Sequence, residues 1–332
     1  MELPRFVKSE KARRTALYTS LLLAGGVIGW FLAGGASSSL YRSVRDTDDG
    51  YRFIAPLLFV QVGEERSFPE YAPLKAALQR YAGDAEVDSI SIYFRDLDTS
   101  QWVGVNPDER FSPASMLKVL TLIAALGEAE ENPAFLTTRI RLPAEDDAVE
   151  GQELYPPEHP VQAGGTYTVE ELMEHLIVES DNRANAALVR AAGERVVAAY
   201  ADLEIPTARE GAEEGYTAQE YSRIFRVLYN GTYLSRAFSE RALALLSRAA
   251  FTNGLVAGVP EGTVVSHKFG VRSFMDSGRT ARELHDCGII YYPGRPYFLC
   301  VMTRGEDLGA LEKVIAGAST AAWEEVSRLG SR

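Results

Sequence analysis

Cysteine, histidine and lysine are all scarce in this sequence. Its 332 residues include two cysteines, four histidines and six lysines. Two cysteines cannot form a disulfide framework, and there is no CxxC pair for zinc or an iron–sulfur cluster. The histidines show no HExxH or other ligand spacing, so neither a metal nor another cofactor is expected. A Gly-x-Ser-x-Gly elbow is also missing, which argues against an α/β-hydrolase.

The chain also has no excess of basic charge. Its 34 Lys and Arg residues and 46 Asp and Glu residues give a formal net charge of −12. Residues 1–35 hold five of the bases and two of the acids, so the remainder carries −15. Phosphate binding needs a basic patch, so this body is expected to bind no nucleic acid. Its 46% of hydrophobic residues is typical of a globular protein with one large domain or two small ones.

One long hydrophobic run lies near the N-terminus. Residues 17–32 carry no charge, and with the small residues that follow they reach about the length that crosses a bilayer core. The bases precede the run, which predicts a cytoplasmic tail (1–15), a transmembrane anchor (16–35) and an exported body in contact with the membrane only through this helix. Residues 33–36 are small, so a cleaved signal peptide, and hence a secreted protein, is the alternative.

The rest of the chain divides into a linker and one domain. Residues 36–67 are mostly small, polar and charged, and they include a short apolar run at 54–62 that is either a strand or a membrane-proximal segment. Residues 68–332 place strands at both ends and helices in the middle, an α+β layout whose two ends share one antiparallel sheet. Strands are expected at 89–94, 101–106, 264–269, 288–292 and 297–303, and helices at 70–81, 113–126, 168–177, 182–192, 216–228, 238–249 and 308–326.

A serine and a lysine lie three residues apart where Pro113 opens a predicted helix. At this spacing Ser115 and Lys118 share one helix face, so the ammonium reaches the hydroxyl. A lysine buried among apolar neighbours has its pKa lowered by desolvation, which makes it a candidate base. The alternative is a chance serine near a surface lysine, because such a pair is weak evidence by itself.

Two further patches have chemical potential. Ser180-Asp181-Asn182 lies at the junction of two predicted helices, where a hydroxyl and an amide can face a cleft or simply cap a helix. Lys268 interrupts an apolar C-terminal strand, with Gly270 two residues later. The glycine allows a ligand or another backbone to approach closely. The alternative for this lysine is an edge-strand charge that prevents aggregation.

Taken together, the three patches are far more specific. S-x-x-K, S-D-N and K-x-G, in this order, resemble the motif set of class A β-lactamases and penicillin-binding proteins. The similarity extends over about residues 68–329 and includes the segments 93–115, 167–185 and 288–305. The resemblance implies a β-lactamase-like α+β fold, in which helices cover the faces of the antiparallel sheet and a central part is all helical.

The resemblance also implies a role for each motif residue. Ser115 is expected to be the nucleophile that forms an acyl-enzyme, activated by Lys118 directly or through water. Ser180 is expected to pass a proton towards the leaving nitrogen, with Lys268 close by. Asn182 is expected to hydrogen-bond the substrate's side-chain amide. The oxyanion hole is expected to consist of the backbone N–H groups of the nucleophile and of Val271, which follows the K-x-G motif.

The sequence departs from the family pattern at Phe269. The family usually has Thr or Ser at this position, and that hydroxyl helps to hold the substrate carboxylate. Ordinary recognition of β-lactams or D-Ala peptides is therefore in question. Arg272 and Arg279 follow shortly after and either clamp a carboxylate instead or serve only surface solubility.

A second departure concerns hydrolysis of the acyl-enzyme. Class A β-lactamases carry a Glu in an E-x-x-L-N stretch that orients the hydrolytic water, and no such stretch lies between residues 182 and 216. Glu210, Glu213 and Glu214 occur there without the pattern and are better explained as a solvated acidic turn. Slow hydrolysis of the acyl-enzyme is the expected consequence.

The sequence therefore predicts an exported serine hydrolase that acts on β-lactams or D-Ala-type peptidoglycan peptides. The missing deacylation Glu favours a D,D-peptidase or transpeptidase-like role as an alternative. A catalytically weak relative that binds or senses cell-wall fragments is a third possibility, favoured by Phe269. Retention of Ser115, Lys118 and Lys268 argues against that third reading.

The two cysteines lie on the two arms of the last predicted hairpin. A register centred on Pro293 to Pro296 places Cys287 and Cys300 diagonally rather than opposite each other. Two buried free thiols are therefore expected.

Overall fold

The structure falls into two units. In the computed structural model the first unit comprises residues 1–49 and 56–67, and the second comprises residues 50–55 and 68–332. The described part of the first unit is an antiparallel pair of strands, β1 (Tyr41–Asp46) and β2 (Leu57–Val62). Described across both units are residues 41–46, 51–55, 57–62, 71–144, 152–205 and 215–330.

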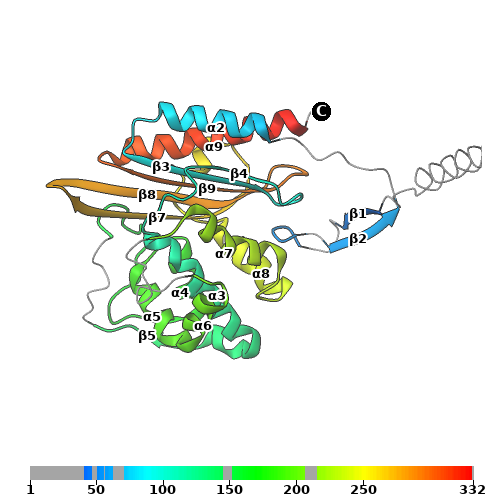
Figure 1. Ribbon diagram of the computed structural model, residues 1–332. Coiled ribbons are helices and arrows are strands. Elements are labelled where there is room, and N and C mark those ends of the chain that lie inside the picture. Colours follow the sequence, from blue (N-terminus) through cyan, green and yellow to red (C-terminus); the bar gives the residue numbers. More distant parts are fainter. Residues whose placement is uncertain are drawn as a thin grey trace, which may run out of the picture. The chain divides into compact units, whose positions relative to one another are not determined.

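A five-stranded antiparallel sheet forms the centre of the second unit (Figure 1). Its strand order is β4–β3–β9–β8–β7, so the two ends of the domain meet in one sheet, as the sequence predicts. Strands β8 and β9 are buried over long continuous runs because the sheet is covered on both faces. The strands are β3 (Ser89–Asp96), β4 (Trp102–Val105), β7 (Val265–Asp276), β8 (Arg279–Ile290) and β9 (Tyr297–Gly305).

Helices form a layer on each side of this sheet. The helices α2 (Ala72–Asp84) and α9 (Leu308–Gly330) lie side by side on one face, as Figure 1 shows. Leu74, Leu78 and Leu311 are buried between these two helices and the sheet. The other helices lie on the opposite side around a second apolar core. They are α3 (Lys118–Glu131), α4 (Val169–Ile177), α5 (Asn182–Ala192), α6 (Glu194–Asp202), α7 (Ala218–Asn230) and α8 (Arg236–Leu246), with the short strands β5 (Arg139–Arg141) and β6 (Thr166–Thr168) beside them.

Local signals fix several helix boundaries. The predicted capping box at Thr168 is present, because its hydroxyl accepts from the N–H of Glu171 and the Glu171 carboxylate accepts from the N–H of Thr168. Gly193 ends α5 with φ +50°. Helix α6 begins immediately after this glycine. The sequence did not predict α6, because a helix stop signal does not indicate that another helix follows without a loop.

The helix predicted to open at Pro113 begins later than expected. A 3₁₀ turn, η1 (Ala114–Leu117), precedes α3, and the N–H of Met116 donates to the Pro113 carbonyl at 3.0 Å. Ala114 has φ +46°, a left-handed conformation that costs a non-glycine residue free energy and persists only when its surroundings hold it. The sequence pattern contains no marker of this bend.

The hairpin of β7 and β8 is longer than the sequence indicates. The predicted strand at 264–269 continues to Asp276, because residues 271–276 pair with 279–284 of β8. Ser277 and Gly278 form the two-residue connection with φ +50° and +87°, the left-handed pair that a tight hairpin requires. The extension was not predicted, because its polar residues interrupt the alternation of apolar residues that indicates a strand.

The expectation of two free thiols was wrong. Cys287 and Cys300 are directly opposite each other on β8 and β9 and form a disulfide. The turn is centred one residue earlier than assumed, since the N–H of Arg295 donates to the Tyr292 carbonyl and Gly294 between them has φ +71°.

The N-terminal predictions are covered only in part. The predicted transmembrane segment lies outside the described residues. In the part of the chain that the structure describes, no helix has both the length and the apolar character needed to cross a membrane. Residues 52–54 belong to the second unit, where the Glu240 carboxylate accepts their backbone N–H groups at 2.6 to 3.0 Å.

Candidate active site

The candidate nucleophile lies on a tightly held turn. Ser115 is in the 3₁₀ turn η1, directly after the left-handed Ala114. Strand β7 runs against this turn at Gly270, where an added Cβ would lie 2.4 Å from the Pro113 carbonyl oxygen and 2.9 Å from Met116 Cγ. Only glycine allows this approach, so Gly270 brings the edge strand alongside Ser115. Val271, the next residue, is half-buried at the same point of the strand.

Lys118 connects the first two motifs. Its ammonium donates to Ser115 Oγ at 3.0 Å, to Ser180 Oγ at 3.2 Å and to Asn182 Oδ1 at 2.7 Å, and it also contacts the Ser180 carbonyl. The side chain is buried at the start of α3. Burial lowers the pKa of Lys118 to about 7, and the nearby Asp181 carboxylate opposes that shift. An amine with such a pKa accepts a proton near neutral pH.

The S-D-N motif joins α4 to α5, and its three residues make different contacts. Asp181 caps α5, with its carboxylate accepting from the N–H of Ala184 at 2.9 Å and of Val161 at 3.0 Å. Ser180 has φ +56° and is buried. Asp181 therefore serves as a helix cap, whereas its neighbours Ser180 and Asn182 both contact Lys118.

Lys268 approaches the same serine from β7. Its ammonium donates to Ser180 Oγ at 2.8 Å and to the Phe269 carbonyl at 3.1 Å, and lies 4.2 Å from the centroid of the Phe269 ring. The side chain has no exposed surface. Burial, reinforced by the charge of Lys118, holds the pKa of Lys268 well below its ordinary value. Two lysines therefore share one hydroxyl, and the charge of Lys118 disfavours the charged form of Lys268.

Several residues of the site were missed by sequence reasoning. Gln152 donates from its amide to the Ser180 carbonyl at 2.9 Å and accepts from the N–H of Asn182 at 3.1 Å. Tyr155 and Phe251 pack against Phe269, with ring centroids 5.6 and 4.4 Å away. We call Tyr155, Phe251 and Phe269 the aromatic wall. These contacts join segments distant in sequence, so no local pattern marks them.

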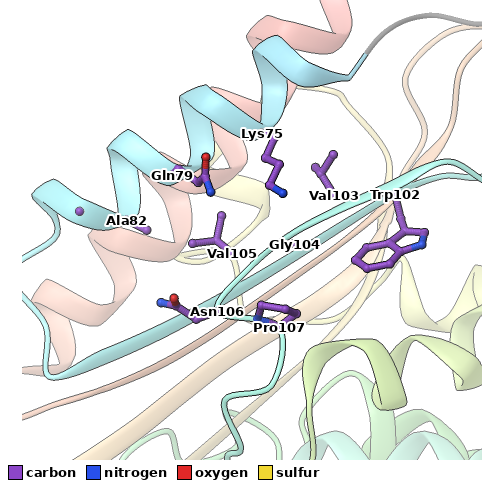
Figure 2. A pocket seen from close by; sticks show the side chains of 10 residues that line it. Lys75, Gln79, Ala82, Trp102, Val103, Gly104, Val105, Asn106 and Pro107 are labelled. Carbon is purple, nitrogen blue, oxygen red and sulfur yellow. The ribbon is translucent and has the colours of Figure 1, made fainter.

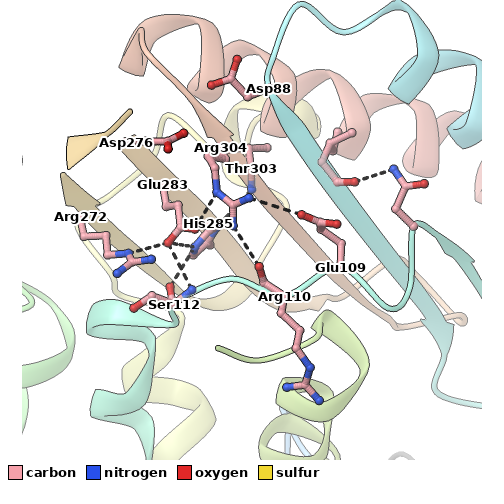
Figure 3. Close-up of polar contacts among 12 residues, drawn as sticks. Asp88, Glu109, Arg110, Ser112, Arg272, Asp276, Glu283, His285, Thr303 and Arg304 are labelled. Carbon is pink, nitrogen blue, oxygen red and sulfur yellow. Dashed lines mark hydrogen bonds and ion pairs between the residues drawn. The ribbon is translucent and has the colours of Figure 1, made fainter. Parts of the chain in front are cut away.

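A buried polar cluster holds the backbone just before the nucleophile (Figure 3). The Glu283 carboxylate accepts the Ser112 N–H at 3.2 Å, and His285 Nε2 lies 3.0 Å from the Ser112 carbonyl. The N–H of Thr303 donates to His285 Nδ1 at 3.1 Å, so the histidine proton must be on Nε2, which then donates to Ser112. Both backbone groups of Ser112 are thereby fixed by neighbouring side chains of β8.

Two arginines balance the charge of this cluster. Arg272 donates to Glu283 at 2.6 Å, and Arg304 donates at 2.9 and 3.1 Å. Burial raises the pKa of Glu283, but hydrogen bonding and the nearby cations outweigh it, and the net pKa is below its ordinary value. The carboxylate is fully buried and remains charged, because the arginines replace the lost water.

Most of the chain matches one protein family. A model described as the Beta-lactamase enzyme family matches residues 73–326, most of the chain. The chain belongs to the beta-lactamase enzyme family. No curated protein matches it.

Solved structures show the same fold at low identity. A class A β-lactamase from Mycobacterium abscessus is 23% identical, with a TM-score of 0.62 over 76% of this chain and 99% of its own. The extended-spectrum β-lactamase TLA-1 is 19% identical, with a TM-score of 0.65 over 76% and 98%. A variant of PBP-A, in an acyl-enzyme complex with penicillin G, is 20% identical, with a TM-score of 0.63 over 79% and 100%.

The two arginines considered as carboxylate clamps are both held in ion pairs. Arg272 is in the ion pair with Glu283, and its guanidinium also lies 4.6 Å from the Phe274 ring centroid. Arg279 is exposed and paired with Asp88 and Glu306, at 3.1 and 3.0 Å. Its partner position on β7 is six residues beyond Gly270, roughly 20 Å along a strand. The structure does not bring Arg279 together with the motif residues.

Two surface hollows lie away from the motif residues. One, of about 560 Å³, lies between α2 and the edge strand β4 and is lined by Lys75, Gln79 and Trp102 among others (Figure 2). Another, of about 510 Å³, surrounds Arg279 and Glu306. Neither is lined by a residue of the three motifs. The acidic residues Glu210, Glu213 and Glu214 lie outside the described residues.

Proposed function

We propose that this protein is an exported serine hydrolase that forms an acyl-enzyme on Ser115. The contact between the Lys118 amine and Ser115 Oγ at 3.0 Å carries the proposal. A buried amine with a pKa of about 7 is matched to accepting a proton from an attacking hydroxyl at neutral pH.

The same contacts support a complete proton path. Ser115 Oγ attacks the substrate carbonyl, and its proton passes to the neutral amine of Lys118. As the new C–O bond replaces the C–N bond, Ser180 gives its proton to the leaving nitrogen. Ser180 regains a proton from Lys118, which lies 3.2 Å away. In net terms one proton moves from the nucleophile to the leaving group, and Lys118 returns to its neutral state.

Backbone donors are proposed to stabilise the tetrahedral intermediate. The N–H groups of Ser115 and Val271 lie on the turn and the strand that Gly270 brings together. Loss of one such donor typically costs about 10²–10³ in rate. Asn182 is proposed to bind the substrate's side-chain amide while it orients Lys118.

The proposed substrates are β-lactams and D-Ala-type peptidoglycan peptides, with slow hydrolysis of the acyl-enzyme. The acyl-enzyme of the PBP-A variant with penicillin G supports this substrate class. The lack of an E-x-x-L-N stretch between residues 182 and 216 supports slow deacylation and therefore a D,D-peptidase-like role.

An extracytoplasmic location with an N-terminal membrane anchor is proposed on two grounds. Residues 17–32 form an uncharged apolar run behind a basic tail. Cys287 and Cys300 form a disulfide. Disulfides persist in oxidising compartments and are rare in the cytosol.

Intact-mass measurements with benzylpenicillin test the acyl-enzyme. The full-length protein is mixed with the drug and followed over time, beside Ser115→Ala and the exposed β7 control Ser273→Ala. We expect a lasting adduct on wild type and on the Ser273 control, and none on Ser115→Ala. Equal labelling of Ser115→Ala would refute the mechanism, and a fleeting adduct with accumulating hydrolysed drug would refute slow deacylation.

A further inference from the structure

Lys268 is engaged by protein groups next to the candidate nucleophile site. Its nitrogen donates to Ser180 Oγ and to the Phe269 carbonyl, and the centroid of the Phe269 ring lies 4.2 Å from it. The side chain is fully buried. Of the three N–H groups of a lysine ammonium, two are thus donated to protein oxygens.

The space next to this lysine is filled by rings. Phe251 stacks on Phe269 at 4.4 Å, and the Tyr155 ring meets both edge-on. The two phenylalanines are 7% and 6% exposed, so the wall leaves little room for a polar group. The Tyr155 hydroxyl is directed to Glu312 of α9, at 2.7 Å.

Lys118 and Arg272, two further cations near this end of β7, are also engaged. Lys118 donates to Ser115, Ser180 and Asn182. Arg272, the next basic residue along β7, is paired with the buried carboxylate of Glu283. Moving Arg272 to a ligand would leave that carboxylate with one partner fewer, which is unfavourable for a buried charge.

We propose that this site does not use the carboxylate of a β-lactam or D-Ala peptide for recognition on the side of the leaving group facing β7, so that acyl donors uncharged there are accepted equally well. This proposal rests on the acyl-enzyme function proposed above. The Phe269 ring lies against Lys268 and the aromatic wall continues from it, so a carboxylate that approaches here loses its water to an apolar surface. An ester or another neutral group at the same place has no charge to desolvate, and it gains contact with the rings.

Benzylpenicillin and its methyl ester provide a matched pair that differs only in this charge. The acylation rate of the wild-type protein is measured with each by intact mass. A site that recognises the carboxylate with a charge-assisted hydrogen bond prefers the acid by about 10- to 100-fold. Here we expect the acid to be preferred by less than tenfold, or not at all.

A preference for the acid of tenfold or more would overturn this proposal and leave the acyl-enzyme proposal intact. Labelling by neither compound would overturn both.

Two substitutions test whether the wall sets this selectivity. Phe269→Thr supplies a hydroxyl and opens space beside Lys268, and is expected to raise the acid-to-ester rate ratio about tenfold. Phe251→Leu shrinks the same wall without adding a donor, and is expected to leave the ratio unchanged. A folded Phe269→Thr protein with an unchanged acid-to-ester rate ratio would contradict the proposal that the aromatic wall sets this selectivity. If that variant fails to fold, the wild-type ratio alone decides.

Discussion

Acid is expected to destabilise this protein through His285. The imidazole is fully buried, accepts from the N–H of Thr303 and donates to the Ser112 carbonyl. Burial lowers its pKa from 6.5 to about 4, and Glu283, 3.9 Å away, only partly offsets this. The charges around it are Glu283 and the two arginines that neutralise that carboxylate, Arg272 and Arg304.

The size of the effect follows from the two pKa values. Below pH 6.5 the unfolded chain binds a proton at this residue, whereas the folded protein does not do so until about pH 4. The stability that depends on the neutral ring is therefore complete above pH 6.5 and is lost as the pH falls to about 4. The gap corresponds to about 3 kcal/mol of unfolding free energy.

Urea denaturation between pH 7 and pH 4 measures this loss. His285→Gln keeps a donor for Ser112 without a titrating ring, so its stability is expected to fall with pH less steeply than that of wild type, by about 3 kcal/mol over the range. His159→Gln, at an exposed position, serves as the control and is expected to follow wild type. Parallel curves for wild type and His285→Gln would refute the reasoning.

Four further predictions concern the site and its frame. Gly270→Ala forces a Cβ to within 2.4 Å of the Pro113 carbonyl and is expected to cost about 1–3 kcal/mol of stability and most of the acylation rate. Gly83→Ala, with open space around it in α2, is expected to stabilise by about 0.5–1 kcal/mol, which thermal unfolding measures. The acylation rate is expected to rise with pH up to about 7, as Lys118 loses its proton, and a rate independent of pH between 5 and 8 would contradict its role as base. Reduction of the disulfide at Cys287 is expected to lower stability by about 3 kcal/mol for its loop of 13 residues, and an unchanged melting temperature after reduction would argue against it.

Much of the sheet and most helix positions could be predicted from periodicity and caps. The capping box at Thr168 and the stop at Gly193 are local signals, and the structure contains both. The extension of β7 beyond Phe269 could not be predicted, because its polar residues are held by pairing with β8 rather than by burial of one face. The disulfide was missed for a similar reason, since the hairpin register depends on which residue of the turn takes φ > 0, here Gly294.

The candidate site was predicted as a set of motif residues but not as an environment. Order and spacing singled out Ser115, Lys118, Ser180 and Lys268, which the structure places in one hydrogen-bonded chain. The aromatic wall and the Glu283–His285 cluster arise from contacts between distant segments. Their residues carry no local pattern, because packing across the sheet brings them together.

The most direct test of the central claim is to locate the acyl group. Ser115 and Ser180 both contact Lys118, so a mass increase alone does not distinguish them. Trypsin releases residues 111–118 as one peptide, which contains Ser115 and ends at Lys118, whereas Ser180 falls in another peptide. After reaction with benzylpenicillin, fragmentation is expected to place the adduct on Ser115 Oγ within that peptide. An adduct on the peptide that contains Ser180 would contradict the account.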